Sequence, residues 1–513
     1  MSTIVSAAGY DRPLKTVPRN NWLSIVLISG VIVAYILLAL IVGHKKAPDA
    51  DEALFADPAL NLITNGSMGT RILETAGTPW KGMNQRTYWM PPLYMLAEAV
   101  WFSVFGFSLW SLRALSTAWG LLVLASWWVI MNALFRDRRL ATLTVVLTAL
   151  DNAFIHFGSQ GRMDMMSASL GLVALAAYVN IRERNLFLAV MVSQALVVAS
   201  GLTHPVGGVV WWSGLLLFTL YLDRQRLILR HAWAALVPYV IGALAWGVYI
   251  LRSPSDFVAQ FIGNIFVHDR MGSISIWRRL GMEGSTLVLN FFGITAESSP
   301  WAAAKLIIPF LYAIAIIGGF LRRDIRRSPG FGLLLSLATL SFLLIAVADH
   351  GQRPHYLVHI LICLPPLLAV SIRSHWMTGH IPRAVLLAVT AAFLTLQLSR
   401  TGHLIWRNSF ERNFAPVSRF LDAERKPSDL IMGSAELAFS VGFTPQFIDD
   451  PSLGYHSGKT PDLIVLGERY EVYAVLFRRR DPMIVQHARS LIEQEYCEIY
   501  NQARYRVYRR KPC

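Results

Sequence analysis

The uncharged run NWLSIVLISGVIVAYILLALIVG, residues 21–43, is the feature that most limits the folds open to this chain. Because a helix rises about 1.5 Å per residue, the run is long enough to cross a hydrocarbon layer of about 30 Å. The preceding segment is basic, but no cleavage site of small residues follows, so we expect a retained membrane-spanning helix rather than a removed signal peptide. Only 15% of the residues are charged, against about 25% in soluble domains, so much of the chain must face lipid.

Apolar runs recur along the chain and predict about eleven membrane spans in all. Between them lie short Arg-rich breaks, such as FRDRR (135–139), IRERN (181–185) and LRRDIRR (321–327). Positively charged loops stay in the cytoplasm, so we expect these breaks and residues 1–20 there and the tail after Arg400 on the opposite face. The predicted spans cover residues 21–43, 111–134, 140–157, 166–181, 186–203, 206–222, 232–251, 302–321, 330–348, 356–372 and 384–400.

One further apolar stretch, residues 91–110, does not fit this alternation. It begins with two prolines, contains Glu98 and runs directly into the next predicted span. Counting it as a crossing would place the Arg-rich loops outside, so we interpret it as a helix lying at the outer membrane surface. The predicted first outer loop therefore comprises residues 44–110.

The composition changes after Arg400, and residues 401–513 predict a small extracytoplasmic α/β domain. The predicted fold class is thus a polytopic α-helical membrane protein of the plasma (inner) membrane, with about eleven helices over residues 21–400 and this domain at its C-terminus. Strand character is found at 429–436, 445–450, 462–468 and 504–510, and helical periodicity at 482–496.

Charge, cysteine content and motifs argue against several classes of function. The net charge of +15 comes mostly from the membrane part, because acidic and basic residues are nearly balanced after Thr401, so it reflects orientation rather than nucleic-acid binding. Cys363, Cys497 and Cys513 are too few and too scattered for a disulfide framework or a zinc site. The sequence has no P-loop, GxGxxG or CxxC motif, so a nucleotide cofactor has no recognisable binding segment.

Polar residues gather in the predicted outer loops, near the membrane ends of several helices. Asp51 and Glu52 follow the first span closely and are flanked by apolar residues, whereas we interpret Asp57 as a solvated surface acid. Charges that converge at one membrane face indicate a site for a charged, partly lipid-embedded substrate. The other members of this set are Lys81, Arg86, Tyr88, Arg162, Asp164, His204, Arg353, His355 and Tyr356.

Taken singly, these residues have structural alternatives. Arg162 and Asp164 would form a surface ion pair worth well under about 1 kcal/mol, and His204, which precedes a proline, would cap a helix. The segment HGQRPHY (350–356) would anchor the chain in an interfacial aromatic belt. The set as a whole is therefore stronger evidence than any member.

Three segments in order resemble the C-type (GT-C) membrane glycosyltransferases: DEALFADPALNLITNG (51–66), YWMPPLYMLAEAVWFSVFGFSLWSLRALS (88–116) and GRMD (161–164). Their arrangement is similar to that in the protein O-mannosyltransferase and lipid A aminoarabinose transferase families. Those families carry a DE pair in the first outer loop, a PPL segment before an FG turn, and an Arg-x-Asp element in the second outer loop. The later segment HGQRPHYLVHILICLPPLLAV (350–370) resembles a helix of those families whose basic and tyrosine residues face the lipid phosphate.

The resemblance implies an inverting glycosyltransferase that moves a sugar from a polyprenyl-phosphate donor to a hydroxyl of a lipid, glycan or protein at the outer face of the membrane. Asp51 matches the family's catalytic acid position and would be the general base, activated by partial desolvation. Glu52 would orient Asp51 or bind sugar or metal. Asp164 would position the acceptor or hold Arg162, and Arg162 and Arg353 would neutralise the departing phosphate.

Two departures from those families change the expected phosphate contacts. Met90 stands where they usually have Lys or His, and His204 where the aminoarabinose transferases tend to have Lys. Further contacts are therefore expected from Lys81, Arg86 or Arg353. Tyr88, His204, His355 and Tyr356 complete the predicted substrate-binding set.

Two other classes of protein also fit a polytopic chain with charges at one face. A transporter or lipid flippase is disfavoured because the predicted helices contain few acids and the sequence shows no internal repeat. A catalytically inactive homologue is disfavoured because both acids of the DE pair are present. The sequence identifies no cofactor, and it leaves open a divalent metal ion, the sugar and the acceptor.

Overall fold

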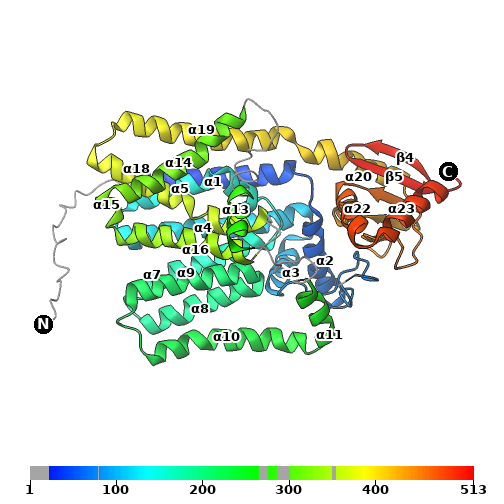
Figure 1. Ribbon diagram of the computed structural model, residues 1–513, viewed down its shortest axis with the longest axis horizontal. Helices are drawn as coiled ribbons and strands as arrows, with labels where there is room; N and C mark the ends of the chain where they lie inside the picture. The colour runs from blue at the N-terminus through cyan, green and yellow to red at the C-terminus, as the bar shows by residue number, and fades with distance from the viewer. Residues whose placement is uncertain (1–21, 79, 265–274, 287–300, 349–353) are drawn as a thin grey trace.

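The computed structural model describes residues 22–78, 80–264, 275–286, 301–348 and 354–513, and it is mainly helical (Figure 1). The predicted cytoplasmic segment 1–20 and Arg353 lie outside the described residues. The helical elements are α1 (Trp22–Lys45), α2 (Ala50–Asn65), α3 (Leu93–Phe105), α4 (Leu109–Phe135), α5 (Arg138–Ala149), α6 (Asn152–Gly158), α7 (Met163–Ile181), α8 (Leu186–Thr203), α9 (Pro205–Asp223), α10 (Leu229–Ile250), α11 (Pro254–Phe257), η1 (Val258–Ile262), α13 (Ile276–Thr286), α14 (Trp301–Leu321), α15 (Arg323–Arg326), α16 (Pro329–Ala348), η3 (Pro354–Leu357), α17 (Val358–Leu361), α18 (Leu364–Thr378), α19 (Arg383–Arg407), η4 (Phe410–Phe414), α20 (Ala415–Glu424), η5 (Ala435–Leu437), α21 (Ala438–Val441), α22 (Glu468–Arg480) and α23 (Pro482–Glu495).

All eleven predicted spans fall on these helices. Within the described ranges, nine helices are long and apolar enough to cross a membrane, and the pair α5–α6, bent by 66°, makes a tenth. The span predicted at 302–321 falls on α14, whose stretch Leu306–Leu321 is a shorter apolar helix. Asp151 explains the bend, because its side chain accepts hydrogen bonds from the backbone N–H groups of Ala153 and Phe154 and so starts a new helix. The chain is a multi-pass helical membrane protein.

The Arg-rich breaks gather at the end of the bundle opposite the C-terminal domain (Figure 1). Arg182 binds Asp223 across the α7–α8 and α9–α10 turns, with 2.8 Å between Nη1 and Oδ2. Arg373 of α18 likewise binds Asp137 between α4 and α5 at 2.7 Å. The Arg-rich turns between helices therefore lie at the same end of the bundle, where ion pairs hold them in place.

The apolar stretch 91–110 contains α3, which is too short to count among the membrane spans. It packs against α2 and α4. Glu98 faces inward and is completely buried beside Tyr94. Burial raises the pKa of this carboxyl well above its ordinary value, which favours its neutral form in these apolar surroundings.

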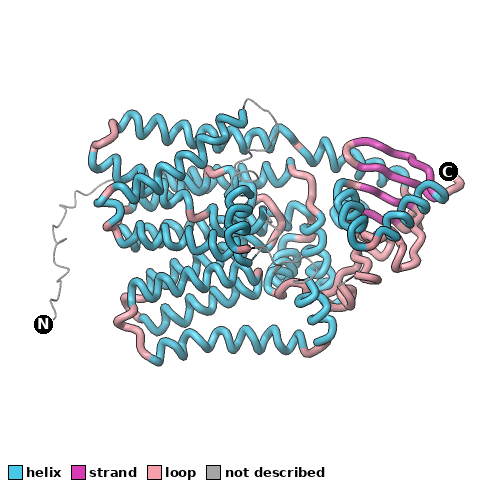
Figure 2. Tube along the Cα trace, viewed as in Figure 1, coloured by secondary structure: helices cyan, strands magenta, loops and turns pink. Residues whose placement is uncertain are grey.

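Among the described residues, the strands lie in the C-terminal domain, at the right of Figure 2. They form one sheet in the order β2-β1-β3-β5-β4, in which β1 pairs in parallel with β2 and β3, and β5 pairs antiparallel with β3 and β4. Each of the four predicted strand segments contains a strand, and the predicted helix contains α23; β4 and α22 were not predicted. The strands are β1 (Ile431–Gly433), β2 (Phe447–Ile448), β3 (Leu463–Leu466), β4 (Tyr496–Gln502) and β5 (Tyr505–Arg510).

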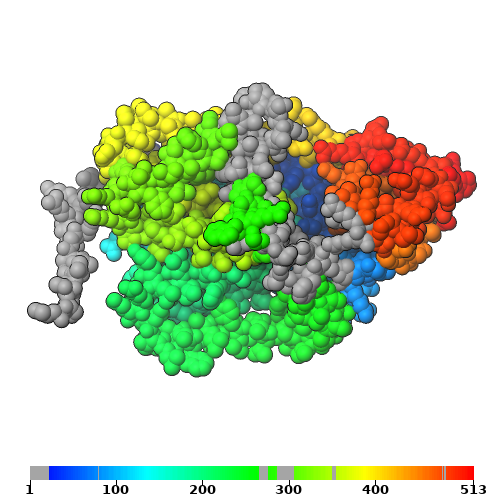
Figure 3. All heavy atoms as spheres, in the orientation of Figure 1, coloured from blue at the N-terminus to red at the C-terminus, as the bar shows by residue number. Residues whose placement is uncertain are grey.

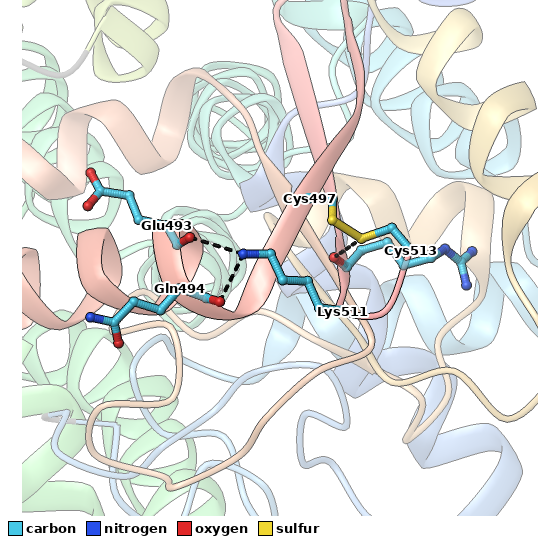
Figure 4. The surroundings of a disulfide bond; sticks show 6 residues. Glu493, Gln494, Cys497, Lys511 and Cys513 are labelled. Carbon is cyan, nitrogen blue, oxygen red and sulfur yellow. Dashed lines mark hydrogen bonds between the residues drawn. A yellow bond between two sulfur atoms is a disulfide. The ribbon is translucent and has the colours of Figure 1, made fainter.

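A single disulfide joins Cys497 on β4 to Cys513, a pair that the sequence analysis, which excluded a disulfide framework, did not anticipate (Figure 4). The β4–β5 hairpin returns the chain end to the start of β4, so cysteines separated by 16 positions become neighbours. Beside them, the Lys511 ammonium donates hydrogen bonds to the carbonyls of Glu493 and Gln494 in the last turn of α23, at 3.3 and 2.9 Å.

The C-terminal domain is packed onto residues 44–110, the predicted first outer loop. One apolar cluster joins Ala53 and Leu54 of α2 to Val417, Phe447 and other buried residues of the domain. Leu73 forms a parallel bridge with Asp449, next to β2, and the N–H of Asp449 donates to the Ile72 carbonyl at 2.6 Å. In Figure 3 a dark-blue part of the chain, from its first helices, is visible in a recess between the bundle and the orange domain. This junction positions the candidate site.

Candidate active site

Asp51 and Glu52 lie in the first turn of α2. Asp49 caps the helix by accepting a hydrogen bond from the N–H of Asp51 at 2.9 Å, and the Glu52 carboxylate accepts one from the N–H of Asp49, also at 2.9 Å. This reciprocal capping fixes where the helix begins. Acids are favourable in this turn, because the N-terminal end of a helix carries partial positive charge.

Asp51 forms an ion pair with Arg162, the residue just before α7. Nε of Arg162 also donates to Oδ2 of Asp164 at 3.0 Å, so one guanidinium joins two of the predicted acids. The side chains of Arg162 and Asp164 are almost fully buried, whereas 39% of the Asp51 side chain is exposed. The other oxygen of Asp164, Oδ1, is buried without a hydrogen bond from any described residue.

The electrostatics of Asp51 differ from the sequence expectation. We expected partial desolvation to raise its pKa and so make it a better base. Burial is the largest single influence and acts in that direction, but the positive charges around it, Arg162 first and then Arg469, together outweigh it and hold the pKa of Asp51 below its ordinary value. Asp51 is therefore an ionised carboxylate over the whole physiological pH range.

Glu52 points away from Asp51 and into the protein. Its oxygens accept hydrogen bonds from Nε and Nη2 of Arg113 at 2.8 and 2.6 Å and from the N–H of Gly161 at 2.7 Å. Arg113 also donates to the carbonyls of Gly43, Lys46 and Ala47, at the C-terminal end of α1. The Glu52–Arg113 pair thus connects α1, α2, α4 and the turn before Arg162, which places Arg162 opposite Asp51.

Asp57 is not a solvated surface acid, and that prediction was wrong. It is fully buried and accepts hydrogen bonds from Oγ1 of Thr70 at 2.8 Å, from the N–H and Nε of Arg71 at 2.5 and 3.1 Å, and from the N–H of Ile72 at 3.2 Å. The sequence shows only an acid in a predicted outer loop, with no sign of its partners. The structure shows that this carboxylate holds the loop against α2.

Among the other predicted residues, His204 packs against Tyr356, and Tyr356 lines the same cavity as Arg162. The ring centroids of His204 and Tyr356 lie 4.7 Å apart, and His204 lies 6.3 Å from His359. His204 also starts α9, because its Nδ1 accepts the N–H of Gly207 at 3.3 Å. His204 therefore both caps α9 and packs against Tyr356.

Lys81, Arg86 and Tyr88 lie on a separate part of the first outer loop. The carbonyls of Lys81 and Arg86 accept hydrogen bonds from the Gln260 amide at 2.9 and 3.0 Å. The Tyr88 hydroxyl donates a hydrogen bond to the Tyr249 carbonyl at 3.0 Å. These residues attach the loop to η1 and the end of α10, and none of them lines the two cavities described next.

Two cavities meet at Asp51. The larger, of about 600 Å³, lies between the bundle and the C-terminal domain; the smaller, of about 240 Å³, is mainly apolar and aromatic. Asp51 and Arg469, the latter from α22, line both. The larger cavity is also lined by Lys46, Asp49, His156, His355, Arg407, Glu436, Glu468, Arg504 and Tyr505, and the smaller by Phe55, Trp80, Trp89, Met90, Arg162, Asn264, Tyr356 and Tyr473.

Several residues of this site were not predicted, among them Lys46, Arg113 and Arg469. Arg113 is the only charged residue in the predicted span 111–134. An isolated charge inside a membrane span indicates a functional or paired residue, so Arg113 could have been predicted from the sequence. Arg469 carries no such signal, because it is one of many basic residues in the tail. No group of three or more His, Cys, Asp or Glu side chains suited to a metal ion occurs among the described residues.

The helical bundle, the DE pair at the start of α2 and the C-terminal domain packed over it define the class of fold: it is that of the GT-C glycosyltransferases. Among solved structures, the chain is similar to ArnT from Cupriavidus metallidurans bound to undecaprenyl phosphate. That likeness covers 94% of this chain and 97% of that one, with a TM-score of 0.62 and 17% identity. The expected resemblance is confirmed at the level of the fold.

A second solved structure has the same fold at greater distance. It is the Archaeoglobus fulgidus oligosaccharyltransferase AglB in complex with an inhibitory peptide and a dolichol-phosphate. The match covers 93% of this chain and 69% of that one, with a TM-score of 0.52 and 13% identity. No family model and no curated protein matches the sequence.

Proposed function

We propose that this protein is an inverting glycosyltransferase that moves a sugar from a polyprenyl-phosphate donor to an acceptor hydroxyl at the outer face of the membrane. The observation that carries the proposal is the place of Asp51, an ionised carboxylate on the wall shared by two cavities. A direct displacement needs two substrates that meet at one base. The solved relatives bind polyprenyl phosphates, undecaprenyl phosphate in ArnT and dolichol-phosphate in AglB, which supports the donor class.

The two cavities suggest how the substrates are arranged. Phe55, Trp80 and Trp89 give the smaller cavity flat apolar faces that suit the C–H surface of a sugar ring. The larger cavity is lined by more charged side chains than the smaller one and suits the acceptor. We therefore assign the donor sugar to the smaller cavity and the acceptor to the larger.

The chemical step is a single displacement in which Asp51 is the base. The acceptor oxygen attacks the anomeric carbon while the bond from that carbon to the phosphate oxygen breaks, which inverts the configuration. The acceptor proton passes to Asp51, and the phosphate leaves with the bonding electrons. Arg162 and Asp164 keep the Asp51 carboxylate oriented during this step.

The orientation in the membrane is part of the proposal. The Arg-rich turns lie at the end of the bundle that we assign to the cytoplasm. The Cys497–Cys513 disulfide supports an extracytoplasmic C-terminal domain, since disulfides persist in oxidising compartments. The site then opens on the outer face of the plasma (inner) membrane.

The test is sugar transfer by purified, membrane-inserted protein carrying Asp51→Asn. The amide keeps the size of the carboxylate but cannot accept the proton, so transfer should fall by at least roughly 10²-fold, the lower end of the usual range for a general base. We expect the lower end because Arg162 makes Asp51 a weak base. Asp422→Asn, at an exposed carboxylate on α20, is the matched control and should leave transfer unchanged.

The substrates are identified first, by mass spectrometry of membranes from a deletion strain. We expect a missing glycosylated product and an accumulated polyprenyl-linked sugar. If Asp51→Asn transfers sugar at the wild-type rate, the assignment of the base is wrong. If the deletion changes no glycosylated molecule, the proposed function fails.

A further inference from the structure

We propose that a groove between α5, α18 and α19 binds an anionic glycerophospholipid at the end of the bundle opposite the C-terminal domain (Figure 1). The groove has a volume of about 270 Å³ and shares no lining residue with the two cavities at Asp51. The inference goes beyond the proposed function and does not rest on it. Three observations support it: the form of the groove, the arginines that meet there, and the engagement of the nearby acids.

Helical spacing brings the residues that line the groove to one face of each helix. Arg139 and Leu143 lie four positions apart on α5, as do Leu386 and Thr390 on α19. Leu387 also lines the groove and is 59% exposed, so the groove opens on the outside of the bundle. A volume of about 270 Å³ is too small for a whole phospholipid. The groove therefore takes the start of one acyl chain, and the rest of the lipid stays in the bilayer.

Arginines from all three helices meet at this groove. Arg139 of α5 and Arg373 of α18 line it. The guanidinium carbon of Arg383, the first residue of α19, lies 5.3 Å from the centre of the Trp376 ring, which lines the groove as well. Tryptophan is enriched where a membrane meets water, and a guanidinium donates two parallel hydrogen bonds to a phosphate. The residues therefore match the headgroup region of a phospholipid.

The two arginines that line the groove still have donors to offer. The Arg139 side chain is exposed, and its guanidinium forms no ion pair or hydrogen bond with any residue that the structure describes. Arg373 is only 17% exposed and is oriented by Asp137, since its Nε donates to Oδ2 of that residue at 2.7 Å. Its two terminal nitrogens make no hydrogen bond within the described ranges. A lipid phosphate can therefore bind both guanidinium groups.

The acids at this end of the bundle are already engaged. Asp137 both binds Arg373 and caps the first turn of α5, because its Oδ1 accepts backbone N–H groups there. The described acids of the other Arg-rich turns also have arginine partners, since Glu183 and Asp223 pair with Arg182, and Asp324 pairs with Arg322. Positive charge is therefore in surplus around the groove. Basic pockets between membrane helices bind anionic headgroups for this reason.

The test measures lipid binding to the full-length protein in detergent by quenching of tryptophan fluorescence. The probe is phosphatidylglycerol with bromine atoms on the upper part of its chains, and phosphatidylethanolamine brominated in the same way is the zwitterionic comparison. Bromine quenches the tryptophans that it contacts, so the quenching that is lost in Trp376→Phe is the signal of this groove. We expect saturable quenching of Trp376 at a lower concentration of phosphatidylglycerol than of phosphatidylethanolamine.

Two variants with matched controls test the two parts of the site. Arg139→Gln removes an exposed charge and should weaken phosphatidylglycerol binding by roughly fivefold or more. Thr390→Phe fills the groove with a ring and should also weaken binding, because the acyl chain loses its space. Arg184→Gln removes an exposed arginine of another Arg-rich turn, and Val389→Phe adds the same ring to α19 outside the groove. Both controls should bind the lipid as the wild type does.

Three results would overturn the proposal. Equal weakening by Arg139→Gln and Arg184→Gln would show a general attraction to the positive end of the bundle rather than a site. Equal affinity of the groove for the two lipids would remove the preference for an anionic headgroup. Wild-type affinity in both Arg139→Gln and Thr390→Phe would show that the lipid binds elsewhere. Sugar transfer is no part of this assay, so its failure and that of the proposed function are distinguishable.

Discussion

The buried pair between Glu52 and Arg113 gives the sharpest prediction about stability. The two side chains are 1% and 3% exposed, and they are joined by hydrogen bonds of 2.6 and 2.8 Å. Glu52→Gln leaves the Arg113 cation buried without its counter-ion and turns an amide N–H towards it. Removing one partner of a buried pair costs about 3–5 kcal/mol, so we expect a loss of that size in the free energy of unfolding.

The measurement is tryptophan-fluorescence unfolding of the purified protein in a mild detergent, with Glu411→Gln as the control. Glu411 pairs with Arg419 at 3.4 Å, but the side chains are 53% and 71% exposed, so this loss should stay below about 1 kcal/mol. The double variant Glu52→Gln/Arg113→Met no longer contains the unpaired cation. Its cost should therefore be lower than the sum of the single changes by up to about 3 kcal/mol.

The same pair predicts a pH dependence with a definite sign. Burial raises the pKa of Glu52, but Arg113, Lys46 and the Gly161 N–H together outweigh it and hold the pKa below the ordinary value. The stabilisation is therefore present above the ordinary Glu pKa and is lost as the pH falls through the lower, folded-state pKa. Glu52→Gln should abolish this dependence. Equal stability of Glu52→Gln and Glu411→Gln, or strictly additive double-variant costs, would refute the account.

Three further outcomes are expected. A reporter fused after Cys513 should be active only on the outer face of the membrane, and cytoplasmic activity would reverse the proposed topology. Replacing Cys497 and Cys513 with Ser should destabilise the C-terminal domain by about 3 kcal/mol, because the disulfide closes a loop across 16 positions; proteolysis of that domain would report the loss, and unchanged resistance would contradict it. Arg162→Gln should raise the pKa of Asp51 and move the acid limb of the transfer profile to higher pH, whereas an unmoved limb would show that Asp51 does not control it.

Local patterns in the sequence were enough to find most of the membrane part. Long uncharged runs, Arg-rich breaks and the double proline before residue 93 identify helices and their ends, because the bilayer selects for length and apolarity. The DE pair could also be recognised in the sequence, because two adjacent acids beside a membrane span are unusual. In the C-terminal domain the alternating segments predicted four strands, but β4 was missed: its hairpin turns at Ala503 and Arg504, both with positive φ (54° and 70°), without the usual Asn-Gly signal.

The partners of the charges were decided only by tertiary packing. Asp57 appears solvated in the sequence but is buried under the loop it holds, and Glu52 turns to Arg113 rather than to Asp51. Arg469 reaches the wall beside Asp51 because the C-terminal sheet docks on the first outer loop. The burial and pairing of a charged side chain depend on which distant segments of the chain meet. The residue type alone does not show whether water or a counter-ion will surround that side chain.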